Sequence, residues 1–207
     1  MTIVARSLGL AAVLAVAAPG LAQGKGPYEV KSGVYEYSAI LSRTTAYFDD
    51  YGLKEAKYTT TGGGTLGAGM EMPVTHSLEI TFADGTQYDI DLDQKTATSV
   101  KIPPEAARAL GATMSPALTK NAKIRDLPPM QILGKTCTGK ETSVPSMKMV
   151  TRVWTWKGIP LRAEMSSAQG QGKPLVVEVS SLNVVPVPAA KFQVPARVKI
   201  QYASAEK

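Results

Sequence analysis

Alternation of apolar and polar residues with a period of two is the feature that most limits how this chain can fold. The apolar members of three such stretches are Leu78, Ile80 and Phe82, then Tyr88, Ile90 and Leu92, and then Leu161, Ala163 and Met165. Successive side chains of a β-strand point to opposite faces, so each stretch has one apolar and one polar face. This pattern is typical of antiparallel strands with one buried side. Asp84-Gly85 and Lys157-Gly158 are turn signals beside these stretches.

Two regions interrupt this rhythm. Residues 62–69 are rich in glycine and predict a flexible loop without regular structure. Pro103-Pro104-Glu105 opens the main helical candidate, which runs to Leu110-Gly111, because proline and an acidic residue suit a first helical turn and glycine suits the stop. Ser115-Pro116 predicts a second short helix through about Lys123, and Pro128-Pro129 ends this region. We therefore predict a β-dominated α+β domain.

The first 22 residues have the pattern of a secretory signal peptide. Arg6 gives a charged start, residues 8–18 are uninterrupted small and apolar residues, and Gly20 and Ala22 stand at the −3 and −1 positions of a cleavage site. The apolar run is too short to span a bilayer, and a buried N-terminal helix is the alternative interpretation. We expect a single exported domain over residues 23–207, located in the periplasm. No cysteine follows Ala22, so we expect no lipid anchor.

Charge and compartment limit the classes of partner. The net charge of the whole chain is +6, but the basic residues are scattered, and the nearest approach to a cluster is Lys120, Lys123 and Arg125. No run of basic residues is interleaved with aromatic ones, so we expect no nucleic-acid partner. The mild positive charge fits peripheral contact with an anionic membrane surface, or it serves only solubility.

Residues that could carry catalysis or bind a metal are few. His76 is the one histidine and Cys137 the one cysteine, so neither a disulfide nor a zinc site with several soft ligands is available. No serine has the glycine pattern of a nucleophile elbow. Asp89, Asp91 and Asp93 lack the spacing of a calcium loop and suit the exposed face of a strand. We expect no enzymatic activity, no metal, no cofactor and a buried, inert Cys137 thiol.

Five motifs in the same order resemble those of a family of secreted bacterial proteins of unknown function. They are Tyr28-Glu-Val-Lys-Ser-Gly33, Tyr47-Phe-Asp-Asp-Tyr-Gly52, Leu133-Gly-Lys-Thr-Cys137, Val153-Trp-Thr-Trp-Lys-Gly-Ile-Pro-Leu161 and Ala190-Lys-Phe-Gln-Val-Pro195. That family looks like part of the LolA/LolB-like superfamily of periplasmic lipoprotein carriers. The resemblance implies a strongly curved antiparallel sheet, an unclosed barrel, with one or two short helices over its concave mouth. Together with the alternating stretches, it predicts about eight to eleven strands in this sheet.

Several large apolar side chains are candidates for the wall of a ligand cavity. We hypothesise that Trp154, Trp156, Met165, Leu110 and Met149 border an apolar space between the sheet and the helix. The two tryptophans are two residues apart and so share one face of a strand, whereas Met149 joins that face only if a bulge intervenes. Core packing is the alternative interpretation of both the tryptophans and the methionines.

Two functions from different classes follow from these expectations. The first is a periplasmic, non-enzymatic protein that binds a lipid-like or other hydrophobic ligand between the curved sheet and the helix, because an apolar pocket needs no catalytic residues. The second is a structural or protein-interaction module of the cell envelope, with a closed core and no ligand. The sequence leaves the identity of the ligand, the partner proteins and the oligomeric state open.

Overall fold

The computed structural model describes residues 26–66, 70–101, 122–169 and 172–202. Twelve strands form one sheet in the order β14-β8-β7-β6-β3-β2-β1-β13-β12-β11-β10-β9, and β4 pairs with β5 in a separate ribbon. The strands are β1 (Gly33–Ala39), β2 (Ser42–Asp49), β3 (Lys54–Thr61), β4 (Thr65–Leu66), β5 (Met70–Glu71), β6 (Thr75–Thr81), β7 (Thr86–Asp91), β8 (Thr96–Lys101), β9 (Lys123–Ile132), β10 (Lys135–Val144), β11 (Met149–Trp156), β12 (Ile159–Ser167), β13 (Leu175–Asn183) and β14 (Lys199–Tyr202).

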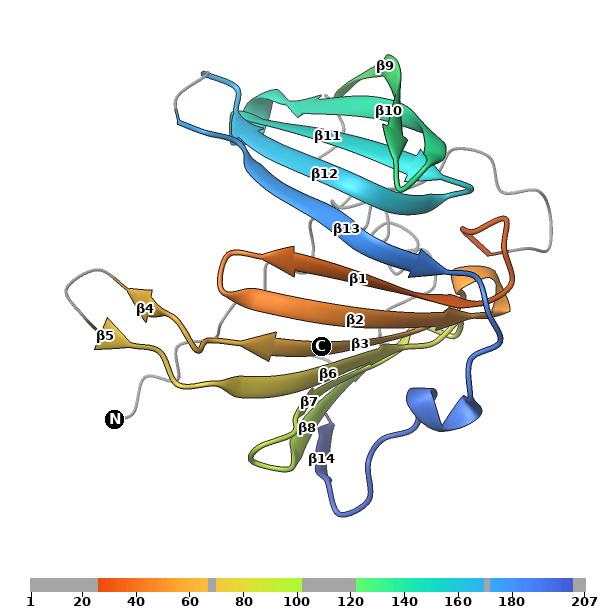
Figure 1. Cartoon of the computed structure of the whole chain (residues 1–207). Coiled ribbons are helices and arrows are strands. Elements are labelled where there is room, and N and C mark those ends of the chain that lie inside the picture. The colour runs from red at the N-terminus through yellow and green to blue at the C-terminus, as the bar shows by residue number, and fades with distance from the viewer. Residues whose placement is uncertain (1–25, 67–69, 102–121, 170–171, 203–207) are drawn as a thin grey trace.

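The large sheet is curved and does not close on itself (Figure 1). Strand β9 pairs only with β10 at one end, and β14 pairs only with β8 at the other. Neighbouring strands are antiparallel except at the β8–β14 pair, which is parallel. The predicted unclosed, β-dominated curved sheet is confirmed, but the strand number was predicted too low, and the parallel β14 was not foreseen.

Helical structure in the described ranges is limited to short 3-10 turns. These are η2 (Asp50–Gly52), η4 (Pro145–Met147) and η5 (Ala189–Phe192). The helix predicted over 103–111 and most of the one predicted over 115–123 lie outside the described residues, whereas Lys123 begins β9. Within residues 26–66, 70–101, 122–169 and 172–202, no helix is long and apolar enough to cross a membrane.

Two local predictions are wrong. Pro128-Pro129 does not end a helical region but lies inside β9, where the register to β10 shifts between Cys137 and Gly139. Proline is tolerated there because β9 is an edge strand, with a hydrogen-bonded neighbour on one side only. Thr65–Leu66, in the predicted flexible loop, pairs with Met70–Glu71.

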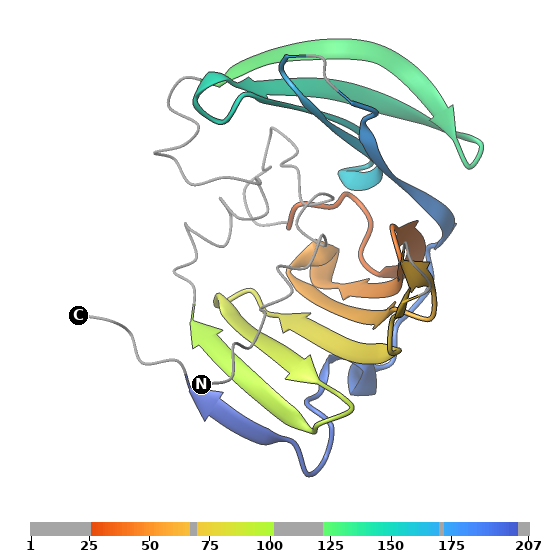
Figure 2. The ribbon, with the colours of Figure 1, turned by 90° about the vertical axis from the view of Figure 1, so that its left-hand side faces the viewer.

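The two faces of the sheet are distinguished by the segments that pack on them. Residues 26–32, just before β1, lie inside the curve of the sheet, whereas η5 lies outside it (Figure 2). The ring of Tyr28 meets Phe48 of β2 edge-on, with 5.0 Å between centroids, so Phe48 points to the inside. Phe192 of η5 packs in a cluster with Ala56 of β3 on the other side. We call these sides the inner and the outer face.

Each half of the sheet buries its apolar residues on a different face. Cross-strand neighbours share a face, and the registers place buried residues of β1, β2, β11, β12 and β13 on the inner face: Tyr35, Tyr37, Ala46, Phe48, Val153, Ala163, Val177 and Val179. The buried residues of β3, β6, β7 and β8 lie on the outer face: Ala56, Leu78, Ile80, Ile90 and Ala97. The inner face of β3, β6 and β7 is therefore left to polar side chains.

The predicted turn at Lys157-Gly158 joins β11 to β12 and also anchors the segment before β1. Gly158 has φ +80°, and a Cβ atom there would lie 2.2 Å from the carbonyl oxygen of Pro27. The Glu29 amide donates to the Lys157 carbonyl at 3.0 Å. Glycine is required both for this backbone conformation and for the close approach of the two segments.

Candidate functional site

Trp154 of the predicted cavity wall is buried against neighbouring strands. Its side chain is 6 % exposed. It lies across from Gly139 of β10, and its Nε1–H donates to the carbonyl oxygen of Pro128 in β9 at 3.2 Å. The indole therefore links three strands, β9, β10 and β11, which is the role of a core residue.

Trp156 lies at the end of β11 and is half-buried. The ammonium groups of Lys135 and Lys157 stand 4.3 Å and 5.1 Å from its ring centroid. Cations at this distance are attracted to the face of an indole, so Trp156 holds two hairpin ends together.

The remaining predicted residues are separated from Trp154. The register of β11 with β12 is regular from Met149 to Trp154, which places Met149 and Trp154 on opposite faces. Met165 pairs with Thr151 and so shares the face of Met149, the inner one. Leu110 lies outside the described residues. The structure thus brings the two half-buried methionines together and leaves Trp154 on the other side.

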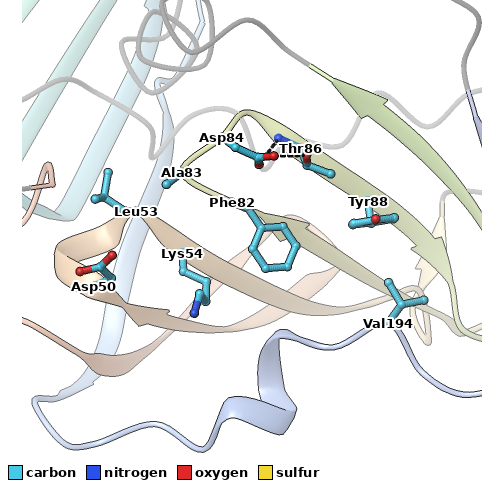
Figure 3. A pocket seen from close by; sticks show the side chains of 9 residues that line it. All are labelled: Asp50, Leu53, Lys54, Phe82, Ala83, Asp84, Thr86, Tyr88 and Val194. Atoms are coloured by element: carbon cyan, nitrogen blue, oxygen red, sulfur yellow. Dashed lines mark hydrogen bonds between the residues drawn. The ribbon is translucent and has the colours of Figure 1, made fainter.

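A surface hollow of about 520 Å³, lined by none of these residues, lies near the β6–β7 turn (Figure 3). It is lined by Asp50, Leu53, Lys54, Phe82, Ala83, Asp84, Thr86, Tyr88 and Val194. The Asp84 carboxylate there accepts from the amide of Thr86 at 3.0 Å and from its hydroxyl at 2.9 Å. These bonds hold the pKa of Asp84 below its ordinary value. This carboxylate is occupied in stabilising the turn rather than directed at a ligand.

A polar cluster on the inner face is the strongest candidate site. One cross-strand row runs from Tyr35 through Ala46, Lys57 and Glu79 to Asp89. The Lys57 ammonium lies 3.3 Å from Glu55 Oε2 and 3.0 Å from Glu79 Oε1. The side chains of Lys57 and Glu55 are only 15 % and 16 % exposed, which is low for charged groups.

Three tyrosines border this cluster on the side of β1. The hydroxyls of Tyr28 and Tyr35 both donate to Glu55 Oε1, at 2.8 Å and 3.0 Å. Burial, followed by the charge of Glu55, raises the pKa of both tyrosines well above the ordinary value. The Tyr37 hydroxyl is also buried, but it has no hydrogen-bond partner among the described residues. A buried unpartnered hydroxyl is costly, so this position calls for an explanation.

Electrostatics keep the cluster charged. Burial disfavours the Lys57 ammonium, but the charges of Glu55 and Glu79 outweigh it and hold its pKa well above the ordinary value. Two carboxylates thus surround one ammonium, so the cluster carries net negative charge. Burial also raises the pKa of Asp89, the next residue in the row. Tyr37 lies two residues from Tyr35 on the same inner face of β1, and Tyr35 begins the cross-strand row that contains Lys57.

The sequence alone did not single out this cluster. Glu55 and Lys57 alternate with Ala56 and Tyr58, which is a recognisable strand pattern. That pattern predicts a polar face, and a polar face is ordinarily solvated. The only signal for burial would have been the pairing of β3 with β2, which is a tertiary contact.

A second charged network lies on the face of Trp154. Glu141 accepts from Arg125 at 2.7 Å and 3.0 Å and from Arg152 at 2.8 Å. Arg162 continues the network to Glu164 and Glu178. The network runs across β9, β10, β11, β12 and β13 and pairs every charge in it, so it stabilises the sheet.

The residues with potential for catalysis or metal binding have structural roles here. His76 Nδ1 lies 2.9 Å from Asp93 Oδ1, and Asp91 Oδ1 accepts the amides of Asp93 and Gln94 in the following turn. Cys137 is buried, as predicted, and burial raises the pKa of its thiol. Over the described ranges, no three or more His, Cys, Asp or Glu side chains are arranged to hold a metal ion.

Comparisons with known proteins place the fold. No model of a protein family and no curated protein matches the chain. An uncharacterized conserved protein from Thermus thermophilus is similar in structure, with a TM-score of 0.55 at 7% identity over 84% of this chain and 92% of that one. This likeness shows that the two proteins share a fold.

Two other solved structures align less well. The MucA/MucB complex of Pseudomonas aeruginosa matches with a TM-score of 0.46 at 13% identity, over 84% of this chain and 58% of that one. The chain thus spans less than two thirds of that neighbour. LolA superfamily protein NE2245 from Nitrosomonas europaea matches with a TM-score of 0.31 at 10% identity, over 89% and 95% of the two chains.

Proposed function

We propose that this chain is an exported, non-enzymatic binding protein of the periplasm, which holds a lipid-like or other hydrophobic ligand against the inner face of its open sheet. The observation that carries the proposal is the composition of that face. Half-buried Met149 and Met165 and the apolar residues between β11 and β1 lead directly to the buried polar cluster around Glu55 and Lys57. An amphiphilic ligand has the same division into an apolar and a polar part.

The apolar part of this surface extends over four neighbouring strands. Strand β11 is separated from β1 by three strand spacings, through β12 and β13, which is about 14 Å along the sheet. Methionine side chains adapt to irregular apolar shapes, so Met149 and Met165 suit a ligand that is recognised by its hydrophobicity. The signal-peptide pattern and the resemblance to the periplasmic carrier superfamily support the location.

One observation favours the second candidate, an envelope interaction module with a closed core. Val153, Ala163 and Val177, at the centre of the inner face, are only 0–2 % exposed in the chain itself. If side chains of the protein fill the whole inner face, no ligand is needed to cover it. The two functions therefore differ in whether the half-buried margin of this face binds a ligand.

The test is to isolate the protein from the periplasm and examine it by native mass spectrometry and by organic extraction. We expect a co-purifying lipid, and saturable binding of 1-monooleoylglycerol, a neutral lipid, by the stripped protein. Met149→Gln should weaken binding of this glyceride, whereas Val150→Gln, on the neighbouring position and the opposite face, should not. Protein that carries no lipid and does not bind the glyceride would instead favour the interaction module.

A further inference from the structure

The unpartnered Tyr37 hydroxyl and the negative charge beside it contain information about the ligand. We infer that the polar cluster of Tyr37, Lys57, Glu55 and Glu79 is a headgroup site for a neutral hydrogen-bond acceptor, such as the ester carbonyl of an uncharged acyl glyceride. This inference rests on the proposed function, because it specifies the polar end of the ligand bound there.

The hydrogen bonds of the cluster leave the Tyr37 hydroxyl as the group that a ligand could bind. Glu55 already accepts from Tyr28, from Tyr35 and from the Lys57 ammonium. Tyr37 is 3 % exposed, its ring lies nearly parallel to that of Tyr35 with centroids 6.1 Å apart, and its hydroxyl has no partner among the described residues. A hydroxyl can donate its proton, so an incoming acceptor would satisfy it. A ligand carbonyl would therefore provide a hydrogen bond that no described residue makes to this hydroxyl.

The net charge of the cluster determines which hydrogen-bond acceptors a ligand headgroup can carry. The ammonium of Lys57 is shared between Glu55 Oε2 and Glu79 Oε1, and two carboxylates exceed one ammonium. An anionic headgroup would meet this excess negative charge in a poorly solvated place, where repulsion is strong. A neutral carbonyl meets no such repulsion. The site therefore discriminates against fatty-acid anions and in favour of esters with the same chain.

The structure also indicates the direction from which a headgroup approaches. Glu79 is the most exposed charged member of the cluster, with 31 % of its side chain accessible, against 15 % for Lys57. Tyr28 covers the opposite side, where its hydroxyl bonds Glu55. A ligand whose chain lies between β11 and β1 would thus bring its polar end to Tyr37 of β1 first, with Glu79 of β6 on the far, more exposed side of the cluster.

Two probes with the same acyl chain separate the contribution of the headgroup from that of the chain. They are 1-monooleoylglycerol, which is neutral, and oleate, which is an anion at neutral pH. We expect the stripped protein to bind the glyceride about tenfold more tightly than oleate. Tyr37→Phe should weaken glyceride binding selectively, and Glu79→Gln should strengthen oleate binding. Tyr47→Phe makes the same substitution on the outer face of the adjacent strand β2 and should change neither.

The outcomes separate the headgroup site from ligand binding as such. Equal affinity for the two probes, or glyceride binding that is unchanged in Tyr37→Phe, would overturn the headgroup site while leaving hydrophobic ligand binding intact. Binding of neither probe would remove the proposed function and this inference together. Tighter binding of oleate would show that the cluster recognises an anion and would refute the charge argument.

Discussion

A Cβ atom on Gly139 would lie 2.6 Å from Nε1 of Trp154, so the indole occupies the space that any larger residue at position 139 would need. The same Cβ would lie 2.8 Å from Cβ of Leu127 in β9. The indole thus fits into a gap in β10 that only glycine leaves open. This contact joins β10 to β11 and explains why Trp154 is buried although it lies on the face opposite to Met149.

Gly139→Ala should therefore destabilise the protein by about 1–3 kcal/mol, because the added methyl group displaces Trp154 or Leu127. Near-ultraviolet circular dichroism should show an altered tryptophan signal in the same variant. Gly134→Ala in the adjacent hairpin is the control, because nothing lies within 4 Å of a Cβ there and only its φ of +69° is unfavourable. An unchanged tryptophan signal in Gly139→Ala would contradict the packing described here.

Tyr37→Phe and Tyr35→Phe should differ in their effect on the stability of the ligand-free protein. Loss of the unpartnered Tyr37 hydroxyl should leave the free energy of unfolding unchanged or raise it by about 1 kcal/mol. Loss of the Tyr35 hydroxyl removes a hydrogen-bond donor to Glu55 and should lower the free energy of unfolding by about 1–2 kcal/mol. Urea unfolding followed by circular dichroism measures both values, and equal losses in the two variants would show that Tyr37 has a partner.

Lys57→Met should be strongly destabilising. The substitution leaves Glu55 and Glu79 close together without the ammonium that separates them, and removal of one partner from a buried ion pair costs about 3–5 kcal/mol. Lys101→Met makes the same change at a pair with Asp84 whose side chains are 71 % and 59 % exposed. That exposed pair should contribute less than about 1 kcal/mol, and similar losses in the two variants would mean that Lys57 is solvated.

The Glu141 network should make the free energy of unfolding depend on pH in the acid range. Hydrogen bonds from Arg125 and Arg152 hold the pKa of Glu141 below its ordinary value. A lowered pKa in the folded state stabilises the protein above the pKa of the unfolded state, about 4.3, and this contribution is lost as the pH falls through the folded value. Glu141→Gln should thus reduce stability at pH 7, and the difference from the native chain should shrink below about pH 4.

Urea unfolding at both pH values tests this prediction. Glu36→Gln provides the comparison, because its partner Arg43 is 70 % exposed and such pairs contribute little at pH 7. A Glu141→Gln difference that is the same at neutral and acid pH would show that the loss comes from packing and not from the charge of the carboxylate.

The strands themselves could be predicted from the sequence because alternation is a local property. Leu78 and Ile80, Tyr88 and Ile90, and Leu161 and Ala163 lie in β6, β7 and β12, and the turns at Asp84-Gly85 and Lys157-Gly158 join strands as expected. The buried Cys137 followed from its small and apolar neighbours. The prediction for Pro128-Pro129 is wrong because a proline pair ends a helix or an interior strand, whereas an edge strand accepts it.

Only the tertiary structure decided which face of each strand is buried. A period of two assigns Glu55 and Lys57 to one face of β3 and Ala56 and Tyr58 to the other, but it does not say what packs on either. The segment before β1 brings Tyr28 to the inner face, and η5 brings Phe192 to the outer one. Because both contacts join residues far apart in the chain, the buried polar cluster was set by chain topology, while the sequence alone determined the strands that carry it.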